Sequence, residues 1–286
     1  MRLKVDSHQH FWKLSRGDYG WLKPDNHILF RDFQPDDLLP HLKDHQIDKT
    51  IVVQAAQTME ETEYLLKLYE QHDFIAGVVG WIEMDADDFK EHFTRFQKHK
   101  GFVGLRPMLH EIEDDLWILR PRVKENLSFL IEHDFPIDIL IFPRHLPYIL
   151  EILDEFPQLR AVIDHIAKPH ITRRELEPWK SQMSKIATYE KIMCKLSGMI
   201  TEADPEHWKE DDLKPYISHL IDIFGPRSVM FGSDWPVCLL AGSYKQVHDA
   251  LVNNLPKHLT EEEIRFIFGG NAFRFYNIEE TVSSNA

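Results

Sequence analysis

The chain has 286 residues and a formal net charge of −14, with 43% hydrophobic and 28% charged residues. This composition is ordinary for a globular protein, whereas the negative charge repels phosphate backbones and anionic lipid. We therefore expect no nucleic acid and no membrane as a partner. Polar residues follow Met1 too early for a signal peptide, and two cysteines are too few for a disulfide framework, so we expect a cytoplasmic protein with free thiols.

Short apolar runs rich in β-branched residues recur along the chain and predict strands that are covered on both faces, as in a parallel sheet. We count eight of them, at residues 3–7, 50–55, 75–82, 102–106, 137–141, 161–164, 192–196 and 229–232.

Longer segments with apolar residues at helical spacing separate these runs. They lie at residues 35–46, 59–72, 86–98, 122–133, 146–156, 174–190 and 212–224, and a last one, at 261–276, is interrupted near Gly269-Gly270. Thr58 with Glu61 and Thr260 with Glu263 have the spacing of capping boxes, in which a hydroxyl and a carboxylate satisfy backbone amides reciprocally.

An alternation of strand and helix repeated eight times predicts either a closed (β/α)8 barrel, the TIM barrel, or a long doubly wound sheet. No glycine-rich phosphate loop follows the first strand, which disfavours nucleotide binding. The site residues below favour the barrel. We expect one domain over residues 1–281 and a flexible tail at 282–286.

Histidines and an aspartate stand where three of the predicted strands end. His8 and His10 are two residues apart, so both rings point to the same side of an extended backbone. His165 follows the sixth strand and Asp234 the eighth. Each has a purely structural interpretation when taken alone. His8 and His10 could be a chance pair among 17 histidines, the His165 ring could cap a turn, and Asp234 could form an Asx-turn. Because the carboxyl ends of barrel strands face one mouth, we expect the four to converge.

Further polar and aromatic residues lie near other strand ends. Arg106 offers paired donors for a substrate oxygen, or a structural ion pair. The charge of Lys195, on a strand that is otherwise apolar, must either face the mouth of the barrel or pair with a buried partner. Trp81 and Trp235 are candidates for aromatic walls against a sugar ring, and Cys238 is expected to be a packed thiol.

At this point the chain resembles the amidohydrolase superfamily, in particular its sugar-lactonase branch, which includes L-fuconolactonases, L-rhamnono-lactonases and 2-pyrone-4,6-dicarboxylate lactonases. The resemblance rests on VDSHQHFW at residues 5–12, GW at 80–81, GLR at 104–106, VIDHIAKP at 162–169, KLSG at 195–198 and FGSDWP at 231–236. These stretches occur in order on six of the eight predicted strands.

The resemblance implies a metal-dependent-hydrolase barrel with His8, His10, His165 and Asp234 around the reacting centre. Arg106 stands at the end of the fourth strand, where two-metal members have a bridging lysine or glutamate, and no histidine ends the fifth strand. We therefore expect no two-metal site. Two alternatives stay open: one divalent ion, preferably Zn²⁺, held by those four residues, or hydrolysis without a metal, since a lactone is an activated ester.

The resemblance further implies hydrolysis of a small-molecule sugar lactone, such as the aldonolactone of fucose or rhamnose. In this hypothesis Asp234 is the general base, and His165 and the other imidazoles hold the metal or stabilise the oxyanion. Arg106, Lys195, Trp81 and Trp235 bind substrate.

Two rival functions are a metal-dependent decarboxylase acting on an unsaturated or aromatic acid and a non-catalytic sugar-binding barrel. The oligomeric state is left open. If the chain forms a homo-oligomer, exposed aromatic residues such as Trp179 or Trp208 are candidates for the interface or for a lid.

Overall fold

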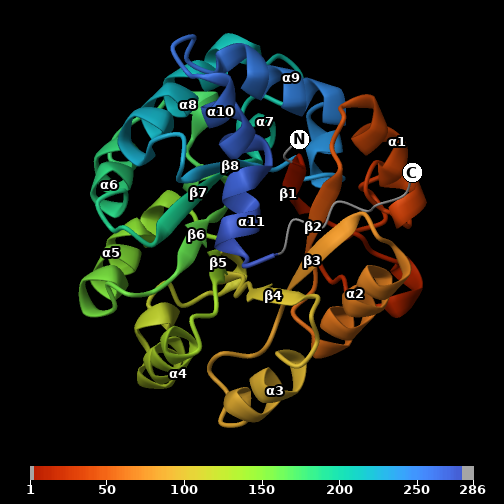
Figure 1. Ribbon diagram of the computed structural model, residues 1–286, viewed down its shortest axis with the longest axis vertical. Coiled ribbons are helices and arrows are strands. Elements are labelled where there is room, and N and C mark those ends of the chain that lie inside the picture. The colour runs from red at the N-terminus through yellow and green to blue at the C-terminus, as the bar shows by residue number, and fades with distance from the viewer. Residues whose placement is uncertain (1–2, 279–286) are drawn as a thin grey trace.

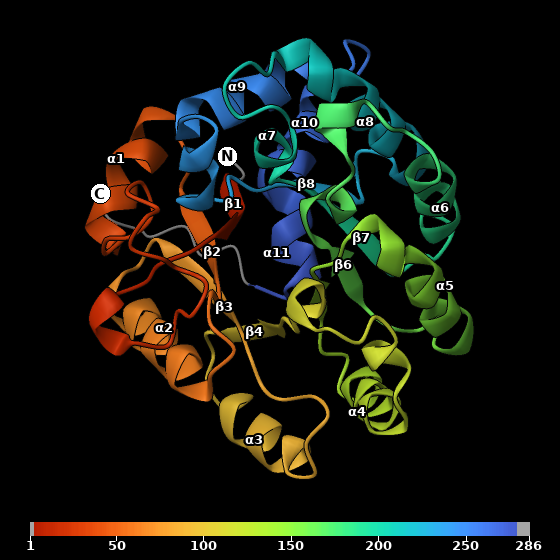
Figure 2. The same cartoon turned by 180° about the vertical axis from the view of Figure 1, so that it is seen from behind.

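The computed structural model describes residues 3–278. Its strands form one sheet of eight parallel strands in sequence order, curled into a nearly closed barrel with helices around the outside (Figures 1 and 2). The strands are β1 (Val5–Gln9), β2 (Lys49–Val53), β3 (Ile75–Gly80), β4 (Phe102–Leu105), β5 (Ile137–Ile139), β6 (Ala161–Ile163), β7 (Ile192–Leu196) and β8 (Val229–Phe231). All eight predicted strands and the (β/α)8 architecture are confirmed. The predicted tail at 282–286 lies outside the described residues.

The helices are α1 (Pro35–Asp44), α2 (Met59–Gln71), α3 (Phe89–Phe96), α4 (Pro121–Glu132), α5 (Leu146–Glu155), α6 (Trp179–Ile186), α7 (Met199–Glu202), α8 (Glu210–Phe224), α9 (Tyr244–Asn254), α10 (Glu261–Arg265) and α11 (Asn271–Phe275). The sequence analysis missed α7 and α9, although Ser243 and Gln246 form a capping box before α9. No helix of the described chain has the length and apolar character needed to span a bilayer.

The two predicted capping boxes differ. At α10 the hydroxyl of Thr260 and the carboxylate of Glu263 each accept from the other's backbone, as predicted. At α2, Thr58 accepts from the amide of Glu61, but the Glu61 carboxylate turns inward and accepts from the amides of Ala55 and Ala56. The reciprocal half of that box was therefore wrong, because the loop after β2 offers buried amides that need an acceptor.

The barrel closes where the end of β1 and the residue after it meet the residues that follow β8. The Asp234 amide donates to His8 O over 2.8 Å, and the His10 amide donates to Trp235 O over 2.8 Å. One isolated bridge pairs Gln9 with Trp235. Backbone hydrogen bonds therefore join the motif at residues 5–12 to the motif at residues 231–236. We call this junction the seam.

One end of the barrel is covered by the last helix, which crosses it in Figure 1. Phe273, Phe275 and Tyr276 pack there with valines from the inner face of the strands. The predicted interruption before this helix is a π turn at Phe266–Gly270, where Gly269 lies too close to Leu3 O to carry a side chain. The opposite end, where the strands finish, is left for the functional site.

Two aromatic residues expected on the surface lie elsewhere. Trp179 is 2% exposed and donates from its ring to Ile166 O over 2.7 Å, so the expectation of an exposed ring was wrong. Trp208 is half-buried and bonds to Ala241 O. Trp179 begins a helix whose apolar face packs inward, and its ring lies on that face.

Candidate active site

Three imidazoles and one carboxylate converge at the carboxyl end of the barrel. The Nε2 atoms of His10, His165 and His8 lie 3.3, 3.7 and 3.9 Å from Asp234 Oδ1. All four side chains are at most 5% exposed. The structure therefore brings together the four residues selected from three different strand ends.

Unusual backbone turns aim two of these side chains. His165 and the next three residues all have positive φ, between 49° and 61°, and Asp234 has a φ of 56°. Such left-handed conformations are costly for residues other than glycine. Glycines lie against two of the histidines. A Cβ on Gly198 would lie 2.6 Å from the His165 ring, and a Cβ on Gly232 would lie 2.7 Å from His8 Cβ. Both glycines leave the space that the imidazoles occupy.

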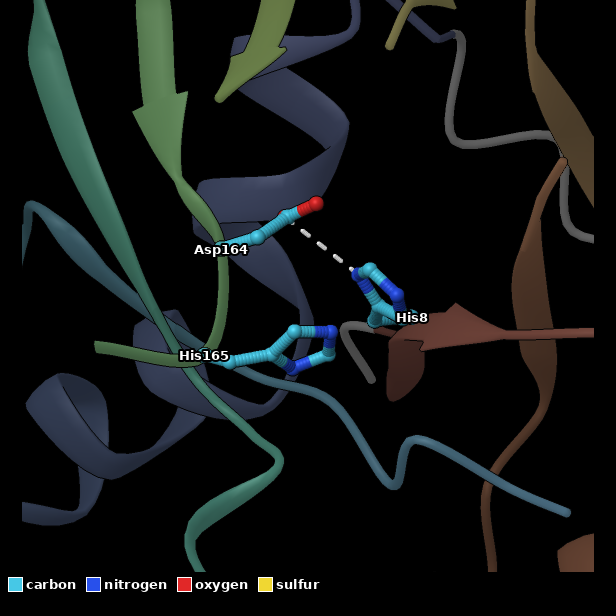
Figure 3. A group of neighbouring side chains, drawn as sticks. All are labelled: His8, Asp164 and His165. Atoms are coloured by element: carbon cyan, nitrogen blue, oxygen red, sulfur yellow. Dashed lines mark ion pairs between the residues drawn. The ribbon is translucent and has the colours of Figure 1, made fainter. Parts of the chain in front are cut away.

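Each imidazole has a partner at its other ring nitrogen. His10 Nδ1 lies 2.8 Å from Val53 O and donates to it, and its Nε2 lies 3.3 Å from Asp234 Oδ1. His165 Nδ1 lies 2.9 Å from Ser197 Oγ. His8 Nδ1 faces Asp164 Oδ1 at 3.3 Å, as Figure 3 shows. Orientation of this kind is typical of metal-ligating histidines. The sequence analysis gave no role to Ser197, although it lies in the KLSG motif.

The surroundings favour neutral rings at His8 and His165 and an ionised carboxylate at Asp234. Burial, and then the charge of Lys195, lowers the pKa of His8 well below its usual value. Burial also lowers the pKa of His165, against the opposing charge of Asp234. Burial raises the pKa of Asp234, but His165 and the hydrogen bond from His10 outweigh it and hold that pKa below its usual value.

A layer of buried charges lies beneath this cluster, towards the barrel interior. Lys195 forms an ion pair with Asp138 Oδ2 and another with Asp164 Oδ1, at 3.1 Å in the second case. Lys195 Nζ is also 3.1 Å from His8 Nδ1. Tyr276 donates to Asp138, with its hydroxyl 2.8 and 2.9 Å from the two carboxylate oxygens. We call Lys195, Asp138, Asp164 and Tyr276 the charged layer.

Burial and the neighbouring cations act in opposite directions on the pKa values of the two aspartates in the charged layer. Burial raises the pKa of Asp138 to about 6, even with Lys195 beside it. Burial also raises the pKa of Asp164, but Lys195, His165 and Arg106 outweigh it and lower that pKa. Lys195 is fully buried and has its partners here, so the structure favours the buried-partner reading over a place in the mouth.

A pocket of about 260 Å³ opens above the cluster. It is lined by His10, Trp21, Ala55, Arg106, Met108, His110, Glu111, Leu140, His165, Lys168, Asp234, Val237 and Leu240. Trp21 is held over it by a 2.7 Å hydrogen bond to Ala55 O. Trp21, His110 and Lys168 were missed; the first two lie in loops without a recognisable motif, whereas Lys168 is part of VIDHIAKP.

Two predicted substrate-binding tryptophans do not line this pocket. Trp235 is 1% exposed and packs edge-on against Phe11 and Phe33. Trp81 lines a separate cavity of about 430 Å³, which shares only Met108 with the first. Neither tryptophan therefore forms a wall of this pocket, because strand-end position does not fix the direction of a ring, and their contact with substrate stays a prediction. Cys238 is a buried free thiol, as expected.

His110, Lys168 and Arg106 are polar residues that line the pocket beside the cluster. Burial, followed by the charge of Arg106, lowers the pKa of His110 to about 3, so its ring is neutral. Lys168 pairs with Glu202 from α7. Arg106 reaches the cluster, with Nη1 3.4 Å from His8 Nε2 and 3.6 Å from Asp164 Oδ2, and also donates to Gln54 O.

The donor set fits one divalent metal ion. His8, His10 and Asp234 each offer a ligand atom within 4.8 Å of the others, and all three are buried. Neutral imidazoles and an ionised carboxylate are the forms that ligate metals. Arg106 at the end of β4 adds a cation where a second metal would need an anionic bridge.

A (β/α)8 barrel with this cluster at its carboxyl end is the arrangement expected of the amidohydrolase family. The chain matches the amidohydrolase family over residues 5–278 and belongs to that family.

Its relatives include two named L-fucono-1,5-lactonases. The protein from Burkholderia ambifaria is 37% identical, with 98% of this chain and 97% of that protein covered. The one from Burkholderia multivorans is 32% identical, with 97% of each covered. A crystal structure of a Burkholderia multivorans amidohydrolase with bound zinc superposes with a TM-score of 0.92 at 32% identity, covering 97% of this chain and all of that one.

Proposed function

We propose that this protein hydrolyses the lactone of a deoxyhexonic acid, with L-fucono-1,5-lactone as the leading substrate. The observation that carries the proposal is the position of Asp234, a carboxylate kept ionised among three imidazoles at the floor of a 260 Å³ pocket. The two lactonase relatives, at 37% and 32% identity over nearly the whole chain, supply the substrate class.

In the proposed reaction Asp234 accepts a proton from a water molecule as the water oxygen attacks the lactone carbonyl carbon. The ester carbon–oxygen bond then breaks, and the departing ring oxygen takes the proton back from Asp234. The product is the open hydroxy acid, so one water is consumed and no other reactant is needed. Arg106 and Lys168 line the pocket as donors for the carbonyl oxygen and a substrate hydroxyl.

We further propose that His8, His10, His165 and Asp234 hold one zinc ion, as the donor set and the zinc-bound relative suggest. When bound, such an ion polarises a carbonyl and lowers the pKa of a coordinated water. The residues of this chain supply the rest: they hold the ring tautomers, accept the proton and orient the lactone. The buried free thiols fit a reducing compartment, so we place the protein in the cytoplasm.

The test is a pH-indicator assay with five- and six-membered aldonolactones, because each turnover releases an acid. We expect L-fucono-1,5-lactone to be among the best substrates. Silence across the whole set would reject the proposal, and release of carbon dioxide from an aromatic acid would replace it with the decarboxylase.

A further inference from the structure

A second group of metal-binding side chains lies on the outside of the barrel, between α1 and α9. It consists of His45, His248 and Asp249, each offering one ligand atom within 4.8 Å of those of the other two. The two imidazole rings are 4.9 Å apart. All three residues are partly exposed, so an ion can reach them from solvent. We call this group the outer cluster.

The contacts of the outer cluster leave Nε2 of each histidine available within the described residues, whereas both carboxylate oxygens of Asp249 already have partners. His45 Nδ1 lies 2.8 Å from His41 O and donates to it, which fixes the tautomer and leaves Nε2 with its lone pair. His248 Nδ1 lies 3.2 Å from Asp249 Oδ1, which leaves Nε2 of that ring unbonded by Asp249. The other carboxylate oxygen of Asp249 is paired with Lys245.

The rings of the outer cluster are held by packing against the barrel. His248 lies 5.8 Å from the ring of Phe231 in β8 and 5.5 Å from that of Phe268. His45 lies 5.0 Å from the ring of Tyr244, on which His41 is stacked. Little side-chain ordering would therefore be needed on binding.

We propose that His45, His248 and Asp249 form a second site for a zinc-like divalent ion, one that fastens α1 to α9 across the seam. Two imidazole nitrogens and a carboxylate oxygen are a common zinc ligand set, with water completing a tetrahedral site. The site lies outside the pocket and does not depend on the proposed lactonase activity.

The position of the outer cluster gives the ion a structural role. The helices α1 and α9 come from opposite ends of the sequence and lie side by side over the seam (Figures 1 and 2). Tyr244 at the start of α9 donates to Asp6 over 3.1 Å, and Asp6 in turn accepts from the amides of Ser233 and His8. An ion joining the two helices would thus stabilise the junction that carries His8 and Asp234.

The experiment measures bound zinc by elemental analysis after the metal-free full chain has been equilibrated with zinc chloride and desalted. Wild type is compared with His45→Ala and with His248→Ala. The matched control is His99→Ala, since His99 is a partly exposed histidine paired at 3.1 Å with one carboxylate, Glu70. We expect one ion fewer per chain in the two cluster variants and the wild-type number in the control. The pocket ion, if bound, is present in all four and cancels.

A thermal measurement gives a second readout. A hundredfold excess of zinc over its dissociation constant should raise the wild-type Tm by on the order of 5 °C more than that of the cluster variants. Asp249→Asn keeps both imidazole rings and should weaken zinc binding by about tenfold or more, which guards against misfolding of the histidine variants. Equal zinc content in all four proteins, or an equal loss in His99→Ala, would overturn the proposal.

Discussion

The mouth of the barrel and the charged layer just below it are both built from buried ionisable groups, yet they face different surroundings. At the mouth, Asp234 and the imidazoles of His10 and His165 line a pocket that solvent and substrate can enter. One layer deeper, Lys195 forms ion pairs with Asp138 and Asp164, Tyr276 donates to Asp138, and neither aspartate lines this pocket.

The difference separates two tasks. A buried charge without a partner is unstable, and the charged layer pairs its two aspartates with Lys195, whose Nζ also contacts His8 Nδ1. At the mouth, Arg106 Nε and His110 Nδ1 have no hydrogen-bond partner among the described residues, so a bound molecule can complete them. We therefore expect substitutions in the charged layer to affect stability first and those at the mouth to affect turnover first.

Lys195→Met should have the largest effect on stability. It leaves the carboxylates of Asp138 and Asp164 buried without their shared cation, which costs about 3–5 kcal/mol. Urea denaturation followed by circular dichroism measures this. The control is Lys90→Met, which removes an ion pair with Glu125 between half-exposed side chains and should cost less than about 1 kcal/mol. Equal losses in the two variants would show that the charged layer is not a structural unit.

Tyr276→Phe should come next, at about 2 kcal/mol, because it removes the hydroxyl that donates to both oxygens of Asp138 and leaves a buried acceptor less satisfied. Tyr189→Phe is the matched control, since its hydroxyl also bonds a carboxylate, that of Asp154, but at the surface. A loss no greater than that of the control in the same denaturation experiment would contradict the reasoning.

Glu61→Gln tests a buried carboxyl that lacks a cation of its own. Burial raises the pKa of Glu61 to about 8, against hydrogen bonds from the Ala56 and Ala55 amides. Between the unfolded value near 4.5 and this folded value, the folded state holds a proton that the unfolded state has lost, so stability falls as pH rises.

The variant removes this dependence. Its stability relative to wild type should therefore increase by about 1.4 kcal/mol between pH 6 and pH 7. The exposed Glu125→Gln should show no such slope. A difference between Glu61→Gln and wild type that stays constant with pH would mean that Glu61 is ionised in the folded protein.

The strands and the cluster can be predicted from sequence because both follow from local patterns. Apolar β-branched runs mark the strands, and the carboxyl ends of parallel strands share one mouth, so His8, His10, His165 and Asp234 must approach one another. The partners of Lys195 depend instead on which inward residue of β5 lies across the barrel, here Asp138, and no local pattern states this.

The directions of the tryptophan rings could not be predicted from the sequence either. Trp235 follows a residue with positive φ, and its ring points away from the pocket and into the packing around Phe33, whereas Trp21 reaches the pocket from a long loop. Neither outcome follows from hydrophobicity or spacing. The walls of the pocket, and with them the fit to one lactone, therefore required the three-dimensional structure.

The most direct measurement is kcat/KM for L-fucono-1,5-lactone with wild type and Asp234→Asn, with circular dichroism to show that both are folded. Asparagine keeps the shape of the side chain but accepts no proton in the physiological range. A loss of about 10²-fold or more is predicted if Asp234 is the base. A folded variant that turns over the lactone at a rate near that of wild type would contradict the proposed mechanism.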